Sequence, residues 1–513
     1  MITIKSLSMG ILSNRNWNTN KGNKTTKGLN FGTAQAEGEW VEKGGHRINP
    51  YFTDFLDVLP EIANNKFLIV GRKGTGKSAI AQFIENECDK TDDSFVHSIT
   101  VSTIEIERII QLTNSNNGDS LVHEWLILLY LTKLIVRSGS AKYSQAIQKL
   151  SNFLSKNTGS VEIDQKQMVE ILEKKGGRVD INMLTQKFQA QFGSSITSTN
   201  PPFVNLLTPL KKIIQTALRY QDLKDKEFII LFDDLDVNYD LSKEDDCKRL
   251  MDLIRTVSSI NNNLSSNARV LLFLRDDVIS HLAPKYNDSA KIIDSHKVEI
   301  NWYVHNLNKL NEDDVPLKKL ANQRIKIAFQ KNGITIPQKV TPWDFLIEES
   351  VGYPKSSFKY ILDFTFYKPR DLVLLFNTIS DDAYKYPLTN YDIEKVLNSY
   401  CYKLKNEILS ELTLYFNERE KKAIYDHVFQ HIANDIKNYK NTRFTDLAAY
   451  INNLHLFKIN GEEVIRILWG YSLIGYKDSD GNIYYNHREE IYPGGIENAY
   501  IELPNCIRRL YKV

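Results

Sequence analysis

The segment from Gly71 to Ser78 has residue types and spacings that suit a chain of phosphates. It reads G-R-K-G-T-G-K-S, and its glycines let the backbone turn so tightly that successive N–H groups can point at one phosphate. Lys77 would add positive charge, and the Ser78 hydroxyl would hold Mg²⁺. The pattern therefore predicts an ATP site formed by Gly71, Arg72, Lys73, Gly74, Thr75, Gly76, Lys77, Ser78 and Ala79.

Two carboxylates, Asp233 and Asp234, follow a second apolar segment at 228–232. An unbroken apolar run is typical of a parallel strand that is covered on both faces. Ligands of parallel sheets bind at the carboxyl ends of the strands. We therefore expect the two aspartates at the ligand edge of the sheet, with Asp233 as the magnesium ligand, through water.

An arginine, Arg275, follows a third apolar segment at 268–274. If this segment is a neighbouring parallel strand, the guanidinium lies at the same edge as the aspartates. Its planar shape and permanent charge suit phosphate recognition. Two interpretations stay open: Arg275 senses the γ-phosphate, or it is an ordinary solvated or salt-bridged residue.

The elements that must position these side chains alternate between strands and helices. A strand at 66–70 enters the glycine loop, and an amphipathic helix at 77–88 leaves it. Further strands are expected at 95–102 and 296–301. This order predicts an α/β fold with a parallel sheet, as in P-loop NTPases.

Together with Lys368-Pro369-Arg370-Asp371-Leu372, these motifs resemble a family of bacterial P-loop ATPases allied to the STAND and KAP branches of the AAA+-like NTPases. The resemblance runs in motif order from residue 51 to the C-terminus. It implies that Asp234 polarises the attacking water. Turnover would be slow, because relatives usually carry the longer Glu there. It also implies that Arg275 and Arg370 act as γ-phosphate sensors.

Two features separate this chain from the KAP branch. Val237 stands where KAP-type proteins often carry an arginine, and no transmembrane pair interrupts the domain. For Arg370 an alternative remains, in which it pairs with a carboxylate and only braces the helix that it opens. The resemblance also suggests a defence or stress system as the biological setting.

The sequence predicts four regions. Residues 1–50, rich in Asn, Gly, Lys and Thr, are expected to form a flexible arm or to dock on a partner subunit. Residues 51–310 form the ATPase core, with a helical insertion at about 105–222. A helical lid at 311–390 and a winged-helix-like domain at 391–513 complete the chain.

The winged-helix assignment rests on an alternating pattern around a turn at 478–481, which predicts a β-hairpin after several helices. Such a domain suggests DNA, but the expected recognition helix carries Glu462 and Glu463, which repel phosphates. Docking within the chain or on a protein is therefore favoured over DNA. A compensating basic patch would consist of Lys477, Arg488, Arg508, Arg509 and Lys512.

Composition leaves these interpretations unchanged. Across 513 residues, 65 Lys and Arg oppose 63 Asp and Glu, so the net charge of +2 favours no class of partner. The four cysteines, Cys88, Cys247, Cys401 and Cys506, are too far apart for a zinc or disulfide framework. We expect a cytoplasmic protein without a signal peptide or membrane span, because Thr132 and Lys133 interrupt the strongest apolar run.

The sequence thus predicts one chemistry, the hydrolysis of a phosphoanhydride. His427 and His431 have the spacing of a zinc pair, but no third ligand is evident. The main hypothesis is a Mg²⁺-dependent ATPase that acts as a nucleotide-driven switch, with a protein partner or effector. Self-assembly is plausible, because neighbouring subunits often supply arginines in this superfamily. The alternatives are a nucleotide-gated scaffold with little turnover and a DNA-dependent initiator or loader ATPase.

Overall fold

The computed structural model describes residues 25–43, 46–99, 118–139, 145–158, 178–179, 202–233, 235, 239, 243–305, 311–488 and 495–513. Several predictions fall outside these ranges. They concern Asp234, Val237, parts of the insertion expected at about 105–222 and residues 1–24 of the arm.

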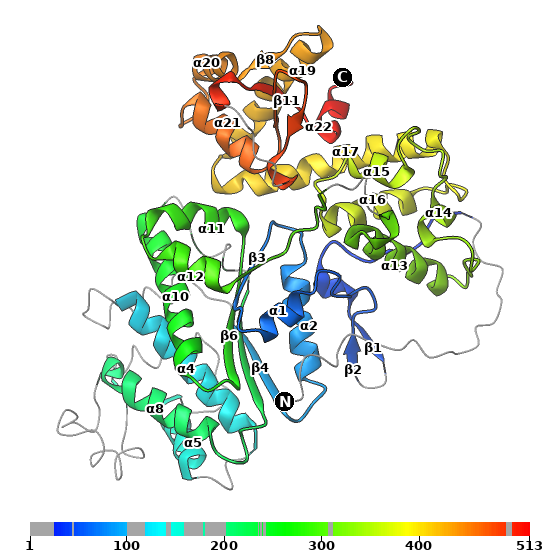
Figure 1. The fold of residues 1–513 in the computed structure, drawn as a ribbon. Coiled ribbons are helices and arrows are strands. Elements are labelled where there is room, and N and C mark those ends of the chain that lie inside the picture. Colours follow the sequence, from blue (N-terminus) through cyan, green and yellow to red (C-terminus); the bar gives the residue numbers. More distant parts are fainter. Residues whose placement is uncertain are drawn as a thin grey trace.

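A five-stranded parallel sheet is built from segments between residues 68 and 299, in the order β4-β5-β6-β3-β7 (Figure 1). The central strands β3, β5 and β6 form because their runs are apolar and lie between covering helices; Phe228 and Leu231, for example, are fully buried. The predicted α/β architecture is confirmed. The strands are β3 (Leu68–Val70), β4 (Ser94–Ile99), β5 (Glu227–Phe232), β6 (Ala268–Leu274) and β7 (Lys297–Glu299).

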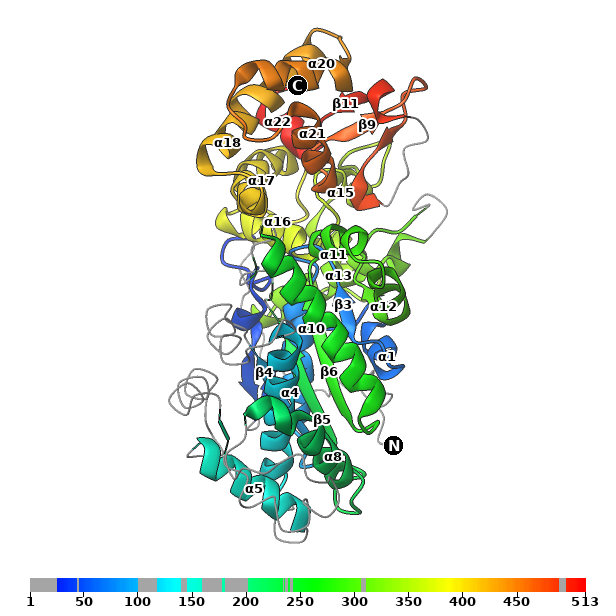
Figure 2. The same ribbon diagram turned by 90° about the vertical axis from the view of Figure 1, so that its left-hand side faces the viewer.

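Helices cover both faces of this sheet (Figures 1 and 2). The helix after β3 lies on one face, and the helices after β4 and β5 lie on the other. This follows from the right-handed crossover of parallel strands, because the chain moves in opposite directions along the sheet after β3 and after β4. The helices of the sheet region are α1 (Val58–Ala63), α2 (Lys77–Cys88), α4 (Gly118–Arg137), α10 (Glu244–Asn263), α11 (Asp276–Leu282) and α12 (Ser289–His296).

The part of the expected insertion that the structure describes is helical. It contains α4, α5 (Gln145–Thr158), the 3₁₀ turn η5 (Phe203–Leu206) and α8 (Leu207–Leu218). The apolar run of α4 is buried, because this helix packs on β5 and α10 as part of the layer over the sheet. Among the described helices, none combines the length and apolarity needed to cross a bilayer.

The lid is a group of helices, three of which begin with a proline, a residue that the first helical turn tolerates. Residues 25–43 pack against it rather than forming a free arm. Leu29 and Phe31 are buried, Thr26 N donates to Tyr384 O, and Tyr384 N donates to the Thr26 hydroxyl oxygen. In that part, the expectation of flexibility is corrected by apolar burial. The lid helices are α13 (Pro316–Lys331), α14 (Pro342–Leu346), α15 (Ser357–Leu362), α16 (Pro369–Asp381) and α17 (Asn390–Glu411).

The C-terminal region combines helices with a small antiparallel sheet in the order β10-β9-β11-β8. The predicted hairpin is present, with Ile483 opposite Lys477. The last helix, α22 (Asn505–Leu510), lies against α17 of the lid (Figure 1). The other elements are α18 (Glu418–Ala423), α19 (Gln430–Lys437), β8 (Thr442–Arg443), α20 (Phe444–Leu454), α21 (Gly461–Gly470), β9 (Gly475–Lys477), β10 (Ile483–Tyr484) and β11 (Tyr500–Glu502).

Candidate functional site

The glycine loop joins β3 to α2 in a fixed conformation. Gly74 and Gly76 have φ angles of +84° and +104°, which residues with a side chain adopt only with strain. The loop is held at both ends: Gly71 N donates to Leu274 O at 3.2 Å, and the buried Trp302 indole donates to Thr75 O at 2.9 Å. The loop therefore has the tight, anchored turn that the sequence predicts.

Lys77, the first residue of α2, reaches back across the loop. Its Nζ lies 2.7 Å from Gly71 O and 3.1 Å from Arg72 O. The loop thus places an ammonium group and the N-terminus of a twelve-residue helix at one point. Both features attract anions.

This loop lies at the switch point of the sheet. β3 and β6 are neighbours, with Val70 opposite Leu274, and their connections leave on opposite faces. Open parallel sheets bind ligands at such a point, outside the carboxyl ends of the strands. Asp233 ends β5, on the far side of β6 from the loop, and is half-buried. Asp234 lies outside the described residues.

Arg275, the residue after β6, is buried and held by a carboxylate. Its Nε and Nη2 donate to the two oxygens of Asp277 at 3.0 and 2.5 Å. Its Nη2 also lies 3.3 Å from the hydroxyl of Tyr471, which donates to Asp277 at 2.6 Å. Burial, reinforced by the Asp277 carboxylate, raises the pKa of the Tyr471 hydroxyl. The structure thus places Arg275 beside the loop and in an ion pair.

Arg370 opens α16 directly above the loop. Its backbone N–H donates to Gly74 O at 3.3 Å, and a Cβ built on Gly74 would come 2.9 Å from the Cβ of Arg370. The guanidinium points to Glu407, with Nη1 3.7 Å from the carboxylate. Arg370 therefore contacts the glycine loop through its backbone and helix α17 through its guanidinium. These contacts are compatible with both interpretations, γ-phosphate sensing and bracing of the lid.

Two further residues, Tyr471 and Ser410, bind the loop to the rest of the molecule. Arg72 Nη2 donates to Tyr471 O at 2.9 Å, and Lys73 Nζ lies 3.1 Å from Ser410 Oγ. Near them, the buried Lys368 contacts Glu411 at 2.9 Å. No pattern in the sequence marks Tyr471, Ser410 or Glu411, because their partners lie 399, 337 and 43 positions away.

Charge compensation around Glu411 sets its ionisation. Burial acts to raise its pKa, but Lys368 and Arg72 outweigh burial and hold that pKa below the ordinary range. Asp371, buried nearby, behaves oppositely: burial raises its pKa, although Lys368 and a hydrogen bond from Phe366 N oppose this. Arg72 of the glycine loop therefore helps to lower the pKa of a lid carboxylate, that of Glu411.

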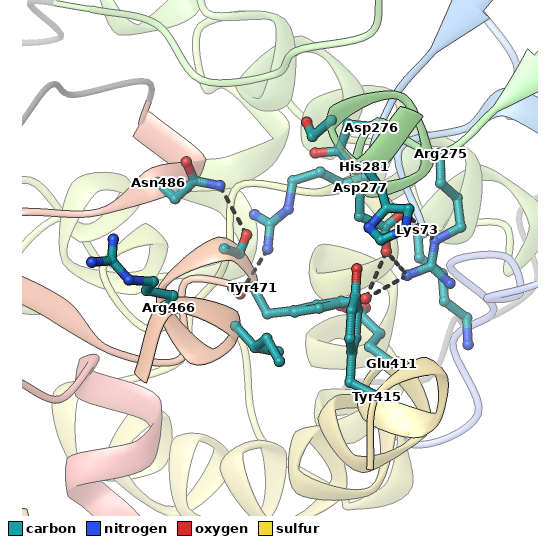
Figure 3. Close-up of a pocket in the computed structure, with 14 residues that line it drawn as sticks. Lys73, Arg275, Asp276, Asp277, His281, Glu411, Tyr415, Arg466, Tyr471 and Asn486 are labelled. Atoms are coloured by element: carbon teal, nitrogen blue, oxygen red, sulfur yellow. Dashed lines mark hydrogen bonds and ion pairs between the residues drawn. The ribbon is translucent and has the colours of Figure 1, made fainter. Parts of the chain in front are cut away.

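A cavity of about 360 Å³ separates the loop and α11 from the C-terminal region (Figure 3). Its volume lies in the range of small-molecule sites. Cationic and acidic groups face each other across it, and Tyr471 and Tyr415 extend into the middle of the view. The charged side chains that line the cavity are Arg72, Lys73, Arg275, Asp276, Asp277, Glu411 and Arg466.

Three members of the expected basic patch contact carboxylates within the chain. Arg509 lies 2.5 Å from Glu394 of the lid, Arg488 lies 3.8 Å from Asp363, and Arg508 lies 3.7 Å from Glu502. Arg509 and Arg488 thus fasten the C-terminal region to the lid. This use of the charges does not favour DNA.

The two histidines with zinc-like spacing remain apart from any ligand set. His431 stacks on Tyr450 with ring centroids 4.1 Å apart, and its Nε2 lies 3.8 Å from Asp435. Within the part of the chain that the structure describes, no three His, Cys, Asp or Glu residues are grouped to hold a metal.

Comparison with known proteins finds one family model that matches part of the chain. Residues 316–409 match the FunZ-associated C-terminal helical domain. This range begins with α13 and ends within α17, so it extends past residue 390, where the sequence analysis ended the lid. The match includes Arg370 but neither the glycine loop nor Arg275.

Two curated relatives match at low identity. The chain is 24% identical over 394 residues to the putative transposon gamma-delta 80.3 kDa protein of Escherichia coli strain K12. This alignment covers 74% of this chain and 51% of that protein. It is 28% identical over 130 residues to the allergen Alt a 2 of Alternaria alternata, which covers 25% of this chain and 61% of that protein. The chain thus spans about half the length of the first relative.

Among solved structures, a Walker-type ATPase of Pyrococcus abyssi aligns over 89% of this chain and 95% of its own. Sequence identity is 13% and the TM-score is 0.36. A likeness of this degree carries no argument about fold or activity.

Proposed function

We propose that this chain binds ATP with Mg²⁺, hydrolyses it slowly and uses the bound nucleotide to control contacts between its lid and its ATPase core. The observation that carries the proposal is the glycine loop at the switch point of the sheet. There, two glycines with positive φ, the Lys77 ammonium and a helix N-terminus converge.

The residues present fit a magnesium ion that accompanies ATP. Ser78 lies in the first turn of α2. Asp233 directly follows β5, at the same edge of the sheet. Hydroxyl and carboxylate oxygens are ligands that Mg²⁺ accepts, usually together with water and phosphate oxygens. When bound, the ion would polarise the phosphates and neutralise their charge.

Hydrolysis requires a water to attack the γ-phosphorus while the bond to the bridging oxygen breaks, which yields ADP and phosphate. In the proposal, Asp234 accepts the proton of that water. Lys77 holds the β- and γ-phosphates, and Arg275 and Arg370 stabilise the charge that spreads over the γ-phosphate oxygens. Positioning and charge supply the catalysis, since the protein forms no covalent bond to phosphorus.

The switch follows from the present partners of the two arginines. Arg275 contacts Asp277 and Arg370 contacts Glu407. Each guanidinium must exchange a carboxylate for a phosphate before it can act. Because Arg370 opens a lid helix, this exchange would move the lid when nucleotide binds or leaves. The family resemblance adds a defence or stress system as the setting.

The same ion pairs favour the second candidate, a scaffold that holds ATP with little turnover. If Arg275 and Arg370 keep their carboxylates while ATP is bound, the transition state lacks two of its cations. The measurable difference between the candidates is therefore turnover at saturating ATP, not affinity.

The proposal is tested with the full chain and the variant Lys77→Ala. Lys77→Ala should weaken ATP binding on the order of 100-fold, because it removes charge-assisted hydrogen bonds to phosphate. Titration calorimetry measures the affinity, and release of phosphate measures turnover. Equal ATP affinity of Lys77→Ala and the wild type would refute the site.

Lys90→Ala is the matched control, because Lys90 follows the other end of α2 and pairs with Glu87 on the surface. It should bind and hydrolyse ATP as the wild type does. The assay is repeated with duplex DNA at two salt concentrations. Salt-sensitive stimulation would favour the loader ATPase instead.

A further inference from the structure

Tyr471, in the C-terminal region, contacts Arg72 of the glycine loop and also Arg275, which follows β6. Figure 3 shows Tyr471 beside Arg275. Its carbonyl accepts from Arg72, 399 positions earlier in the chain, and its hydroxyl lies against Arg275 and Asp277. The two arginines belong to different loops, after β3 and after β6. Tyr471 therefore joins the C-terminal region to both sides of the switch point.

The contact leaves one nitrogen of the Arg72 guanidinium without a hydrogen bond within the described chain. Arg72 Nη1 is buried and has no hydrogen-bond partner among the described residues. Arg275, 7% exposed, shares one carboxylate with the Tyr471 hydroxyl. A buried donor without a partner costs free energy, and an anion is the partner that a guanidinium binds most strongly.

We propose that Tyr471 is a latch that competes with the phosphates of ATP for Arg72 and Arg275. In the latched state, which the structure represents, the C-terminal region holds the glycine loop and both guanidinium groups serve protein oxygens. Bound triphosphate takes the guanidinium groups, and the C-terminal region separates from the core. This inference rests on the proposed function, since it deepens the regulation of the same site.

The setting of the contact suits a reversible latch. The cavity of about 360 Å³ lies beside it, so the side chains have space to change partners without repacking an apolar core. Most groups that meet there are polar or charged, and such groups lose little free energy when water replaces their partner. Tyr471 itself follows the last residue of α21, so its position depends on the whole C-terminal region.

The test is ATP affinity of the full chain with Tyr471→Phe, which removes the hydroxyl and keeps the ring. A weaker latch raises the fraction of molecules that can bind, so the apparent affinity rises in proportion. We expect ATP to bind about fivefold more tightly than to the wild type. Unchanged affinity, with binding still dependent on Lys77, would overturn the latch and leave the proposed function standing.

Tyr415→Phe is the matched control. Its ring contacts that of Tyr471, with centroids 6.1 Å apart, and it lines the same cavity. Its hydroxyl has no hydrogen bond to any described residue in this structure, so its removal should leave ATP affinity unchanged. An equal gain in both variants would mean that loosened packing, not the latch, causes the effect, and would overturn the proposal.

A double-mutant cycle with Asp277→Asn tests the partner. If the Tyr471 hydroxyl acts through Asp277, Tyr471→Phe should have no further effect on affinity in the Asp277→Asn background. A full fivefold gain in that background would contradict the assignment. Absence of ATP binding in the wild type would instead refute the proposed function, so the two failures are distinguishable.

Movement is measured independently by fluorescence transfer between labels at Asp89→Cys and Tyr439→Cys. Both positions are exposed, Tyr439 fully, whereas all four native cysteines are buried. Addition of ATP should lower transfer efficiency in the labelled chain and not in its Lys77→Ala form. Constant efficiency at saturating ATP would overturn the latch.

Discussion

Two interfaces hold the lid and the C-terminal region in place, and they differ in chemistry. Residues 25–43 attach to the lid through apolar burial and one enclosed ion pair: Phe31 stacks on Phe376 at 5.1 Å, and Arg324 lies 2.6 Å from Glu39. The C-terminal region meets the glycine loop through Tyr471, and lid helix α17 meets it through Ser410, beside a cavity.

This difference in chemistry indicates which of the two interfaces can separate and re-form at low cost in free energy. Apolar groups and a desolvated ion pair have no equal partner in water, so their separation is costly. Polar groups beside a cavity can exchange a protein oxygen for water or phosphate at small net cost. The first interface is therefore a fixed attachment, and the second is suited to open and close.

The fixed attachment is broken most strongly by Arg324→Met. This change leaves Glu39, 5% exposed, without its cation. We expect the free energy of unfolding to fall by about 3–5 kcal/mol, as for other buried ion pairs that lose one partner. Denaturant titration of the full chain measures it.

Lys319→Met is the control for that prediction, because Lys319 lies on the same helix but is exposed and 4.0 Å from Asp314. This substitution should lower the free energy of unfolding by less than about 1 kcal/mol. Equal effects of the two variants would erase the distinction between the interfaces.

A smaller effect is expected for Glu411→Gln, at a residue that lines the cavity beside the second interface. The change leaves the Lys368 ammonium without its carboxylate, and we expect a loss of about 1–3 kcal/mol at neutral pH. Because the folded state holds the pKa of Glu411 below its ordinary value, the stabilisation is present above that ordinary value and disappears as pH falls through the folded value.

The unfolding midpoint measured against pH checks the sign. Wild type should lose more stability on acidification than Glu411→Gln, and the two curves should converge in acid. A constant difference at every pH would show that Glu411 acts by packing and not by charge.

The smallest effect is expected for Arg509→Gln, at the contact between α22 and α17. The guanidinium is mostly buried but Glu394 is 39% exposed. The pair should therefore contribute about 0.2–1 kcal/mol to the free energy of unfolding, and this contribution should weaken with salt. Binding of duplex DNA should not change, because Arg509 already serves Glu394. A large loss of DNA affinity would restore the basic patch as a nucleic-acid surface.

The local part of the candidate site could be predicted because it is encoded over a few consecutive residues. The strand, the glycine turn and the helix that begins at Lys77 follow from apolar runs and from glycines placed where φ is positive. The same holds for the hairpin of β9 and β10, whose turn residues specify it. The centre of the parallel sheet was predictable because β3, β5 and β6 are apolar runs.

Packing against distant residues was not predictable. Composition indicated a flexible arm for residues 1–50, yet Leu29 and Phe31 are buried, since the apolar surface that covers them belongs to lid helices about 300 positions later. A count of polar residues contains no information about such a partner. Only the tertiary structure shows it.

The sequence by itself determined the glycine turn between β3 and α2, because the positive φ angles of Gly74 and Gly76 are a local property of the backbone. The tertiary structure alone decided what holds the surrounding charges: Tyr471 on Arg72 and Arg275, Glu407 on Arg370, and Glu394 on Arg509. The physical reason is range. Backbone conformation is set by neighbours in the chain, whereas the ionic partner of a long side chain is set by whichever element the fold brings beside it.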